Sequence, residues 1–124
     1  MRALSVLLPL TLCLVYSSPS LAFEGRYRAG GGGYNQELTI KKRSAGSYDV
    51  VLVVGTEGCS GYFEGIGAIK GAELAATSPP PADPDDKCVI DVSRHGAALD
   101  VTESGCVSFH GASCEFTGRY KKRR

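Results

Sequence analysis

The residues best suited to chemistry are four cysteines and the histidine that lies between the last two. The cysteines are Cys59, Cys88, Cys106 and Cys114. Cys106, His110 and Cys114 are spaced by four, which would align metal ligands on one face of a helix. Gly105, Gly111 and β-branched neighbours argue against a helix at this place. The spacing therefore favours disulfides, with a metal site and free thiols as the alternatives.

The first 22 residues predict a secretory signal peptide. Arg2 gives a positive start, residues 3–16 form a nearly unbroken apolar run, and small residues follow up to Ala22. We expect cleavage after Ala22, which leaves residues 23–124 in the periplasm with no transmembrane segment. Cys13 raises the alternative of a lipid anchor, but Leu12 precedes it where a lipoprotein signal has Gly or Ala.

An even number of cysteines in a small exported chain predicts two disulfides. Four cysteines allow three pairings, and we expect Cys59–Cys88 and Cys106–Cys114. The second pair flanks a short segment, 107–113, that could fold back on itself. In the loop-entropy model these closures contribute about 3.6 and about 2.6 kcal/mol. With the thiols paired, no cysteine remains as a nucleophile.

The other polar residues form no pattern that predicts an enzyme. His95 lies in a turn, and His110 lies beside Phe109 without a nucleophile and a supporting carboxylate placed near it by spacing. The glycine run 30–33 lacks the Gly-Lys-Ser/Thr that completes a phosphate loop. The acidic residues at 83–86 lack the Gly and Glu of a calcium loop. We predict a non-enzymatic protein with no cofactor and no metal.

Basic charge is concentrated at the C-terminus. Residues 23–118 carry 8 basic and 13 acidic residues. The last six residues include Arg119, Lys121, Lys122, Arg123 and Arg124. Such a tail could bind an anionic surface such as lipopolysaccharide, phospholipid or peptidoglycan. The alternative is a solubilising, frayed terminus, and export together with the acidic remainder argues against a nucleic-acid partner.

Strand patterns dominate the chain after residue 22, and no segment keeps a helical period. Apolar residues alternate with polar ones over 34–41 and 87–93, and glycine-containing turns follow at 43–46, 55–58 and 95–96. Seven or eight short antiparallel strands predict an all-β fold, a small barrel or sandwich with two disulfides. The predicted divisions are signal peptide 1–22, β domain 23–118 and basic tail 119–124, with an exposed proline-rich loop at 78–86.

Matching segments at the two ends of the domain favour a closed barrel. Residues 23–27 read Phe-Glu-Gly-Arg-Tyr and residues 116–120 read Phe-Thr-Gly-Arg-Tyr. Similar segments predict neighbouring strands that pack alike, although coincidence in a Tyr- and Gly-rich chain is the alternative. Closure would also remove the exposed strand edges that promote aggregation.

Residues 105–120, together with 58–61 and 47–50, resemble a small periplasmic domain of alphaproteobacteria that also occurs fused to lysozyme-inhibitor-like modules. This resemblance implies a location and a cysteine framework. A second similarity is to periplasmic inhibitors of c-type lysozyme, disulfide-bonded β-barrels that plug the enzyme's cleft with a Ser-Gly-x-x-Tyr loop. The matching segment 44–48 is out of register and 59–62 is too short, so no inhibitory residue is carried over.

The sequence as a whole predicts an exported, monomeric or weakly dimeric binding protein, with c-type lysozyme as its most concrete partner. An acidic body would attract a basic lysozyme, and a rigid loop such as 105–113 would enter its cleft. Phe109 and His110 in that loop and the basic tail are the candidate binding residues. An envelope structural protein anchored by the tail is the second reading, and an enzyme that uses His110 is the third.

Overall fold

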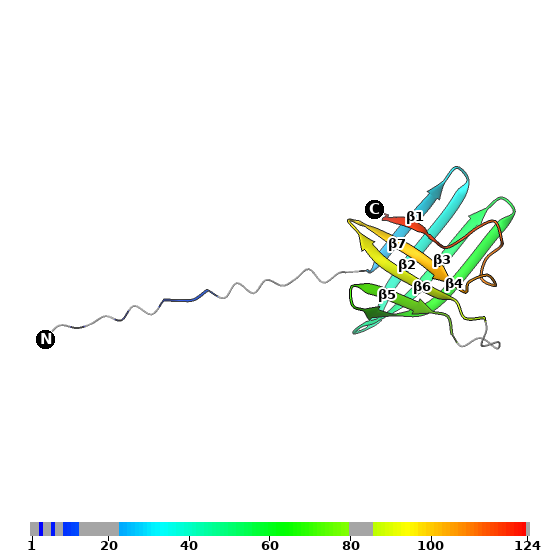
Figure 1. The fold of residues 1–124 in the computed structure, drawn as a ribbon. Coiled ribbons are helices and arrows are strands. Elements are labelled where there is room, and N and C mark those ends of the chain that lie inside the picture. Colours follow the sequence, from blue (N-terminus) through cyan, green and yellow to red (C-terminus); the bar gives the residue numbers. More distant parts are fainter. Residues whose placement is uncertain (1–2, 4–5, 7–8, 13–22, 80–85, 124) are drawn as a thin grey trace.

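The computed structural model describes residues 3, 6, 9–12, 23–79 and 86–123 (Figure 1). The predicted cleavage site at Ala22, most of the signal peptide, most of the proline-rich loop and Arg124 lie outside the described residues. Within the described ranges no helix has the length and apolar character needed to cross a membrane.

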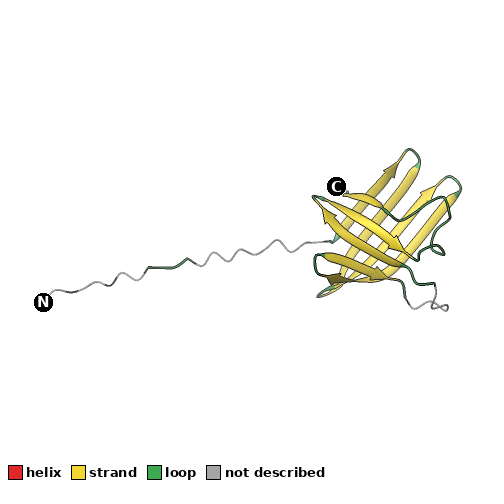
Figure 2. Cartoon of the chain, in the orientation of Figure 1, coloured by secondary structure: helices red, strands yellow, loops and turns green. Residues whose placement is uncertain are grey.

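Eight antiparallel strands form a closed barrel in which each strand pairs with the next and the last pairs with the first (Figures 1 and 2). The strands are β1 (Gly25–Gly31), β2 (Tyr34–Ser44), β3 (Ser47–Thr56), β4 (Cys59–Lys70), β5 (Glu73–Thr77), β6 (Val89–His95), β7 (Ala98–Ser104) and β8 (Gly118–Lys122). The predicted all-β class is confirmed, and the closed barrel rather than the sandwich is the architecture.

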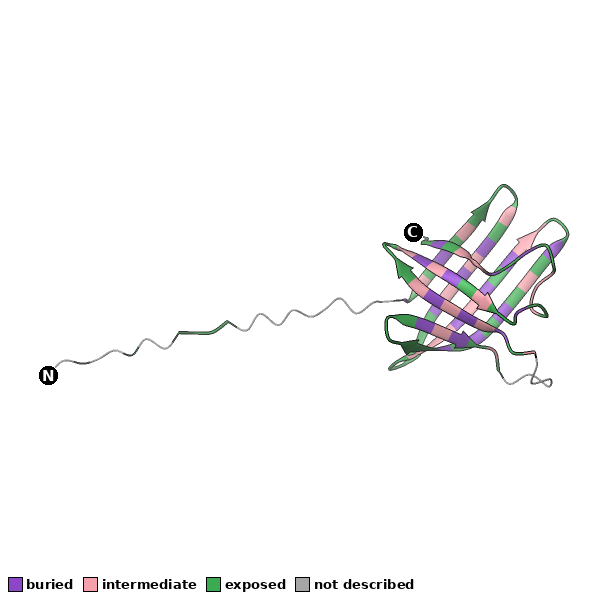
Figure 3. Ribbon diagram, in the orientation of Figure 1, coloured by how far each residue is buried: buried purple, intermediate pink, exposed green. Residues whose placement is uncertain are grey.

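The period-2 pattern of the sequence places one apolar face of each strand inside the barrel, as the alternating burial in Figure 3 shows. Leu38 of β2 lies opposite Leu52 of β3, which in turn lies opposite Phe63 of β4, and all three are fully buried. An eight-stranded barrel has an interior just wide enough for such side chains. Because buried side chains occupy the interior, the surfaces open to a partner lie on the outside of the barrel.

The strands that contain the matching Phe-x-Gly-Arg-Tyr segments, β1 and β8, are neighbours, as predicted. Tyr27 of β1 pairs with Lys122 of β8 in the strand register. Each segment makes the same hydrogen bond, in which the tyrosine hydroxyl donates to the carbonyl four residues earlier: Tyr27 to Phe23 at 2.9 Å and Tyr120 to Phe116 at 2.7 Å. Burial raises the pKa of both phenols. The repeat therefore places one buried, neutral tyrosine on each of the two strands whose pairing closes the barrel.

The predicted boundary between β domain and basic tail does not coincide with a structural boundary. Residues 119–122 belong to β8, which pairs with both β7 and β1. Arg123 continues the pairing, because its N–H donates to the Arg26 carbonyl at 2.8 Å. The reason is the alternation around Tyr120, whose buried ring fixes this segment as a strand in spite of its charge.

Candidate functional site

The connection between β7 and β8, residues 105–117, forms a loop that is tied to strands on both sides. We call it the cap loop. It lies at the end of the barrel that also carries the β3–β4 hairpin (Figure 1). One disulfide joins its Cys106 to Cys88 just before β6, and another joins its Cys114 to Cys59 at the start of β4. The loop is thus cross-linked to two different parts of the barrel.

The predicted pairing Cys59–Cys88 and Cys106–Cys114 is wrong. Val89 lies opposite Ser104, so the ends of β6 and β7 bring Cys88 and Cys106 together, with 4.4 Å between their Cα atoms. Segment 107–113 does not fold back on itself but extends across to β4, which leaves Cys114 beside Cys59. The pairing follows from strand adjacency, which the spacing of cysteines along the chain does not reveal.

The middle of the cap loop pairs with β4 as a short stretch of extra strand. The Tyr62 N–H donates to the Phe109 carbonyl at 2.9 Å, and the Gly111 N–H donates to the Ser60 carbonyl at 3.0 Å. These bonds place His110 opposite Gly61. A Cβ atom at Gly61 would lie only 2.4 Å from the Cβ of His110, so glycine is what allows the loop to approach β4.

His110 and Glu103 form the least exposed ion pair among the described residues. The Nε2 of His110 lies 2.7 Å from Oε1 of Glu103, and their side chains are 8% and 18% exposed. The Nδ1 lies 2.7 Å from the Gly111 carbonyl, so both ring nitrogens face acceptors. Burial lowers the pKa of His110, but the bonds to Gly111 and Glu103 and the nearby carboxylates, Glu115 included, outweigh burial, and the pKa is raised. This environment favours the imidazolium.

Glu103 also fixes the end of the cap loop. Its second oxygen accepts the Phe116 N–H at 2.7 Å, and the Phe116 ring packs edge-on against His110 with 5.0 Å between centroids. From β2, the buried Gln36 amide donates to the Glu115 and Thr117 carbonyls at 2.9 and 3.1 Å. The cap loop is therefore held along most of its length.

A groove opens on the outside of β4 beside the cap loop. It has a volume of about 570 Å³. Its lining residues are Arg43, Asp49, Tyr62, Glu64, Gly65, Ile66, Ser78, Pro79 and Phe109. Tyr62 and Ile66 are large hydrophobic side chains that are about half exposed, at 52% and 49%. We call this feature the β4 groove.

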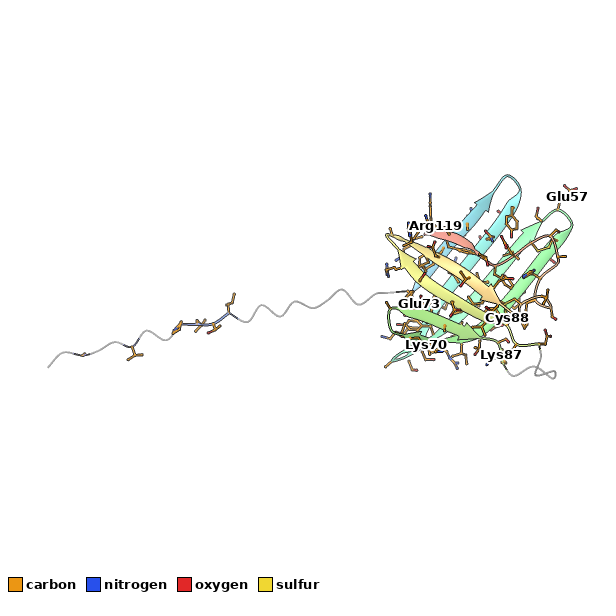
Figure 4. The ribbon with its side chains drawn as sticks, viewed as in Figure 1. Glu57, Lys70, Glu73, Lys87, Cys88 and Arg119 are labelled. Carbon is orange, nitrogen blue, oxygen red and sulfur yellow. A yellow bond between two sulfur atoms is a disulfide. The ribbon has the colours of Figure 1, made fainter. Side chains whose placement is uncertain are left out.

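Basic side chains gather where β8, β1 and the end of β2 lie next to one another. We call this surface the basic face, and its residues are Arg26, Arg28, Lys41, Lys42, Lys121, Lys122 and Arg123. Arg28 of β1 lies opposite Lys121 of β8 in the strand register. The Glu37 carboxylate forms ion pairs with Arg28 at 3.0 Å and with Arg123 at 3.3 Å. Arg119, labelled on β8 in Figure 4, forms an ion pair with Asp100 instead. The hydrogen bond from Arg119 lowers the pKa of the Asp100 carboxyl.

The structure distributes the sequence-predicted site residues over three places. Phe109 lines the β4 groove, and the side chain of His110 is enclosed against Glu103 of β7. Of the predicted tail, Lys121, Lys122 and Arg123 belong to the basic face, whereas Arg119 is bound to Asp100 and Arg124 lies outside the described residues. Sequence reasoning missed Glu103, Tyr62 and Ile66, which carry no linear motif. Tyr62 lies on the outer face of β4 because it alternates with the buried Phe63, but its neighbour Phe109 comes from a distant segment.

Comparison with known proteins adds no relative, since no family model, no curated protein and no solved structure matches the chain. The metal alternative would have needed Cys106 and Cys114 as thiolates, and each is instead bound in a disulfide. Two disulfides are typical of an oxidising, extracytoplasmic environment. The functional inference therefore rests on the barrel fold, the cap loop, the β4 groove and the basic face.

Proposed function

We propose that this protein is a non-enzymatic binding protein exported to the periplasm, with residues 1–22 as its signal peptide. The observation that carries the proposal is the cap loop, which two disulfides and the Glu103–His110 pair hold in one arrangement beside the β4 groove. A loop that is already ordered loses little conformational freedom when a partner binds. With the barrel interior filled by side chains, this outer surface is where a partner would bind.

Inhibition of a c-type lysozyme is the most concrete form of this function. Val107 lies at the outer side of the cap loop and is 82% exposed, which makes it the most exposed large hydrophobic side chain from residue 23 onward in the described chain. A rigid loop with an apolar tip is suited to entering an enzyme cleft. The acidic residues outside the basic face would favour encounter with a basic lysozyme.

The first test measures lysozyme activity directly. We expect micromolar mature protein, residues 23–124, to slow cell-wall clearing by c-type lysozyme. Val107→Asp should weaken inhibition by about tenfold or more, because a buried interface residue contributes over 1–2 kcal/mol. Ala72→Asp adds the same charge in the exposed β4–β5 turn at the other end of the barrel and should leave inhibition unchanged. Unchanged clearing at micromolar excess would refute lysozyme inhibition.

The basic face supports a second candidate, an envelope protein that binds anionic surfaces. Because β8 is part of the barrel, Lys121 and Arg123 are presented beside Arg26 and Arg28 rather than on a separate tail. Juxtamembrane basic residues contribute about 1 kcal/mol each near an anionic lipid surface. Several such residues on one face would suffice for salt-sensitive adhesion.

Co-sedimentation with phosphatidylglycerol vesicles tests the second candidate. Lys121→Gln with Lys122→Gln should weaken binding by about 30-fold, since two lysines contribute about 2 kcal/mol together. The control variant, Lys70→Gln with Lys87→Gln, removes two positive charges that lie outside the basic face and should bind like the wild type. Lys70 ends β4, and Lys87 lies in the loop before Cys88 (Figure 4). Equal pelleting of both variants, or pelleting that does not respond to salt, would contradict this candidate.

A further inference from the structure

The β4 groove lies at a break in the barrel's hydrogen-bond ladder. β5 pairs with β4 only as far as Ile66, which lies opposite Thr77. Continuing that register by two residues would place Glu64 opposite Pro79, and proline has no N–H to donate. On the other side of the break, the cap loop reaches β4 only at Tyr62. A gap therefore remains between Phe109 and Pro79 along one edge of β4.

Backbone groups of β4 face this gap without partners among the residues that the structure describes. Lys70 and Glu73 close the β4–β5 turn, so by alternation every second residue of β4, Tyr62 and Glu64 included, directs its N–H and C=O toward β5. The Phe109 N–H, which could have donated to the Tyr62 carbonyl, donates to Cys106 instead. Among the described residues no backbone hydrogen bond reaches the Tyr62 carbonyl or the Glu64 N–H and carbonyl. Ser78 Oγ, which is buried, also has no described partner.

The side chains around the gap combine apolar walls with an excess of hydrogen-bond acceptors. Ile66, Phe109 and Pro79 provide apolar surface. The Glu64 carboxylate accepts the Tyr62 hydroxyl at 2.9 Å and keeps further acceptor capacity. The one guanidinium in the lining, Arg43, is already paired with Asp49 at 3.3 Å. The groove thus carries one carboxylate without an opposite charge among its described lining residues.

We propose that the β4 groove binds an arginine side chain of a protein partner, an inference that rests on the proposed binding function. Arginine combines an apolar stem with five N–H donors and no acceptor. The stem would pack against Ile66 and Phe109. The guanidinium would donate to the carboxylate and carbonyl of Glu64 and to the Tyr62 carbonyl. Phe109 and Pro79 occupy the two ends of the gap. The gap is therefore too short for an added strand, but a single side chain can enter it from outside.

The probe for this site is the blocked tripeptide acetyl-Gly-Arg-Gly-amide, titrated into the mature protein and followed by amide NMR shifts. We expect saturable shifts concentrated at residues 62–66 and 109. The matched peptide with citrulline, which has the shape of arginine without its charge, should bind about tenfold more weakly or not at all, because charge-assisted bonds are about twice as strong as neutral ones. The lysine peptide should also bind more weakly, because lysine cannot make the forked contact.

Glu64→Gln should weaken binding of the arginine peptide by about three- to tenfold while the fold is retained, because only the groove's unpaired charge is removed. Glu57→Gln removes the same charge at the tip of the β3–β4 hairpin (Figure 4) and should bind like the wild type. Equal binding of the citrulline peptide, equal binding of the lysine peptide, or shifts centred elsewhere would overturn the proposal.

The same variants separate this site from the proposed function. If the arginine peptide binds the groove but lysozyme is not inhibited, the site stands and the lysozyme partner falls. The opposite result is that the wild type and Glu64→Gln inhibit lysozyme equally well while the arginine peptide does not bind. In that case the binding function is supported and the arginine site is refuted.

Discussion

Glu103→Gln is expected to lower the free energy of unfolding by about 3 kcal/mol and to loosen the cap loop. Glu103 binds His110 through one oxygen and the Phe116 N–H through the other, and both side chains of the ion pair are mostly buried. Removing one member of a buried ion pair typically costs about 3–5 kcal/mol, because the other charge stays buried without a partner. Urea unfolding near pH 6, where His110 carries its proton, measures the change.

The matched control is Asp91→Asn, which removes one carboxylate charge from the neighbouring strand β6. Asp91 lies opposite Thr102 of β7, one residue before Glu103. We expect the control to change stability by less than about 0.5 kcal/mol, as surface substitutions usually do. Hydrogen exchange at the Tyr62 and Gly111 amides, which bind the cap loop to β4, should accelerate in Glu103→Gln alone. Equal stability of the two variants would refute the role assigned to Glu103.

The same pair makes stability depend on pH with a definite sign. Burial lowers the pKa of His110, but the bonds to Gly111 and Glu103 and the charges of Glu103 and Glu115 raise it above 6.5 overall. A group whose pKa is raised by folding stabilises the fold fully below its unfolded pKa, and that stability is lost as pH rises through the folded pKa. We expect the wild type to lose stability as pH rises above about 6.5, and His110→Gln to lack that slope. A wild-type curve that is flat there would contradict the imidazolium assignment.

The barrel was predictable from the sequence because its signals are local or repeated. Alternation over 34–41 sets the inward face of β2, and the matching segments that end in Tyr27 and Tyr120 indicated which strands close the barrel. The cysteine pairing was not predictable, because it depends on which strand ends lie next to each other. The seven residues between Cys106 and Cys114 suggest a local link only if the loop folds back. Gly61 instead allows the loop to extend to β4 and pair with it.

The β4 groove was hidden from the sequence for a related reason. Its outward side chains Tyr62 and Ile66 come from one strand, whereas Phe109 and Pro79 come from two loops that meet only in the closed barrel. The one local signal was Pro79, which indicates where a ladder must stop but not which strand is left unpaired. Glu103 was likewise missed, because an acidic residue near the end of a strand is ordinary until its partner is known.

The disulfides can be assigned by peptide mapping, because the arrangement of cleavage sites separates the pairings. Trypsin leaves Cys59 on peptide 44–70, Cys88 on 88–94, and both Cys106 and Cys114 on 95–119. We expect all three peptides to be linked together without reduction, whereas Cys59–Cys88 with Cys106–Cys114 would leave 95–119 separate. Chymotryptic cleavage after Phe109 then shows which of its two halves carries peptide 44–70. We expect this to be the half with Cys114.

Removing the Cys59–Cys114 link should be the most damaging change to stability. This disulfide spans 55 residues and the other spans 18. In the loop-entropy model their removal costs about 4 and about 3 kcal/mol, a large share of the stability of a domain this size. The Cys59→Ala/Cys114→Ala variant should therefore unfold at lower urea than Cys88→Ala/Cys106→Ala, and neither should expose a free thiol. Cys59→Ala/Cys88→Ala breaks both true pairs, so it should unfold at lower urea than Cys88→Ala/Cys106→Ala, which breaks only one. If Cys59→Ala/Cys88→Ala is instead the more stable of the two, Cys59 and Cys88 are bonded to each other in the wild type and the cap loop is not cross-linked to β4.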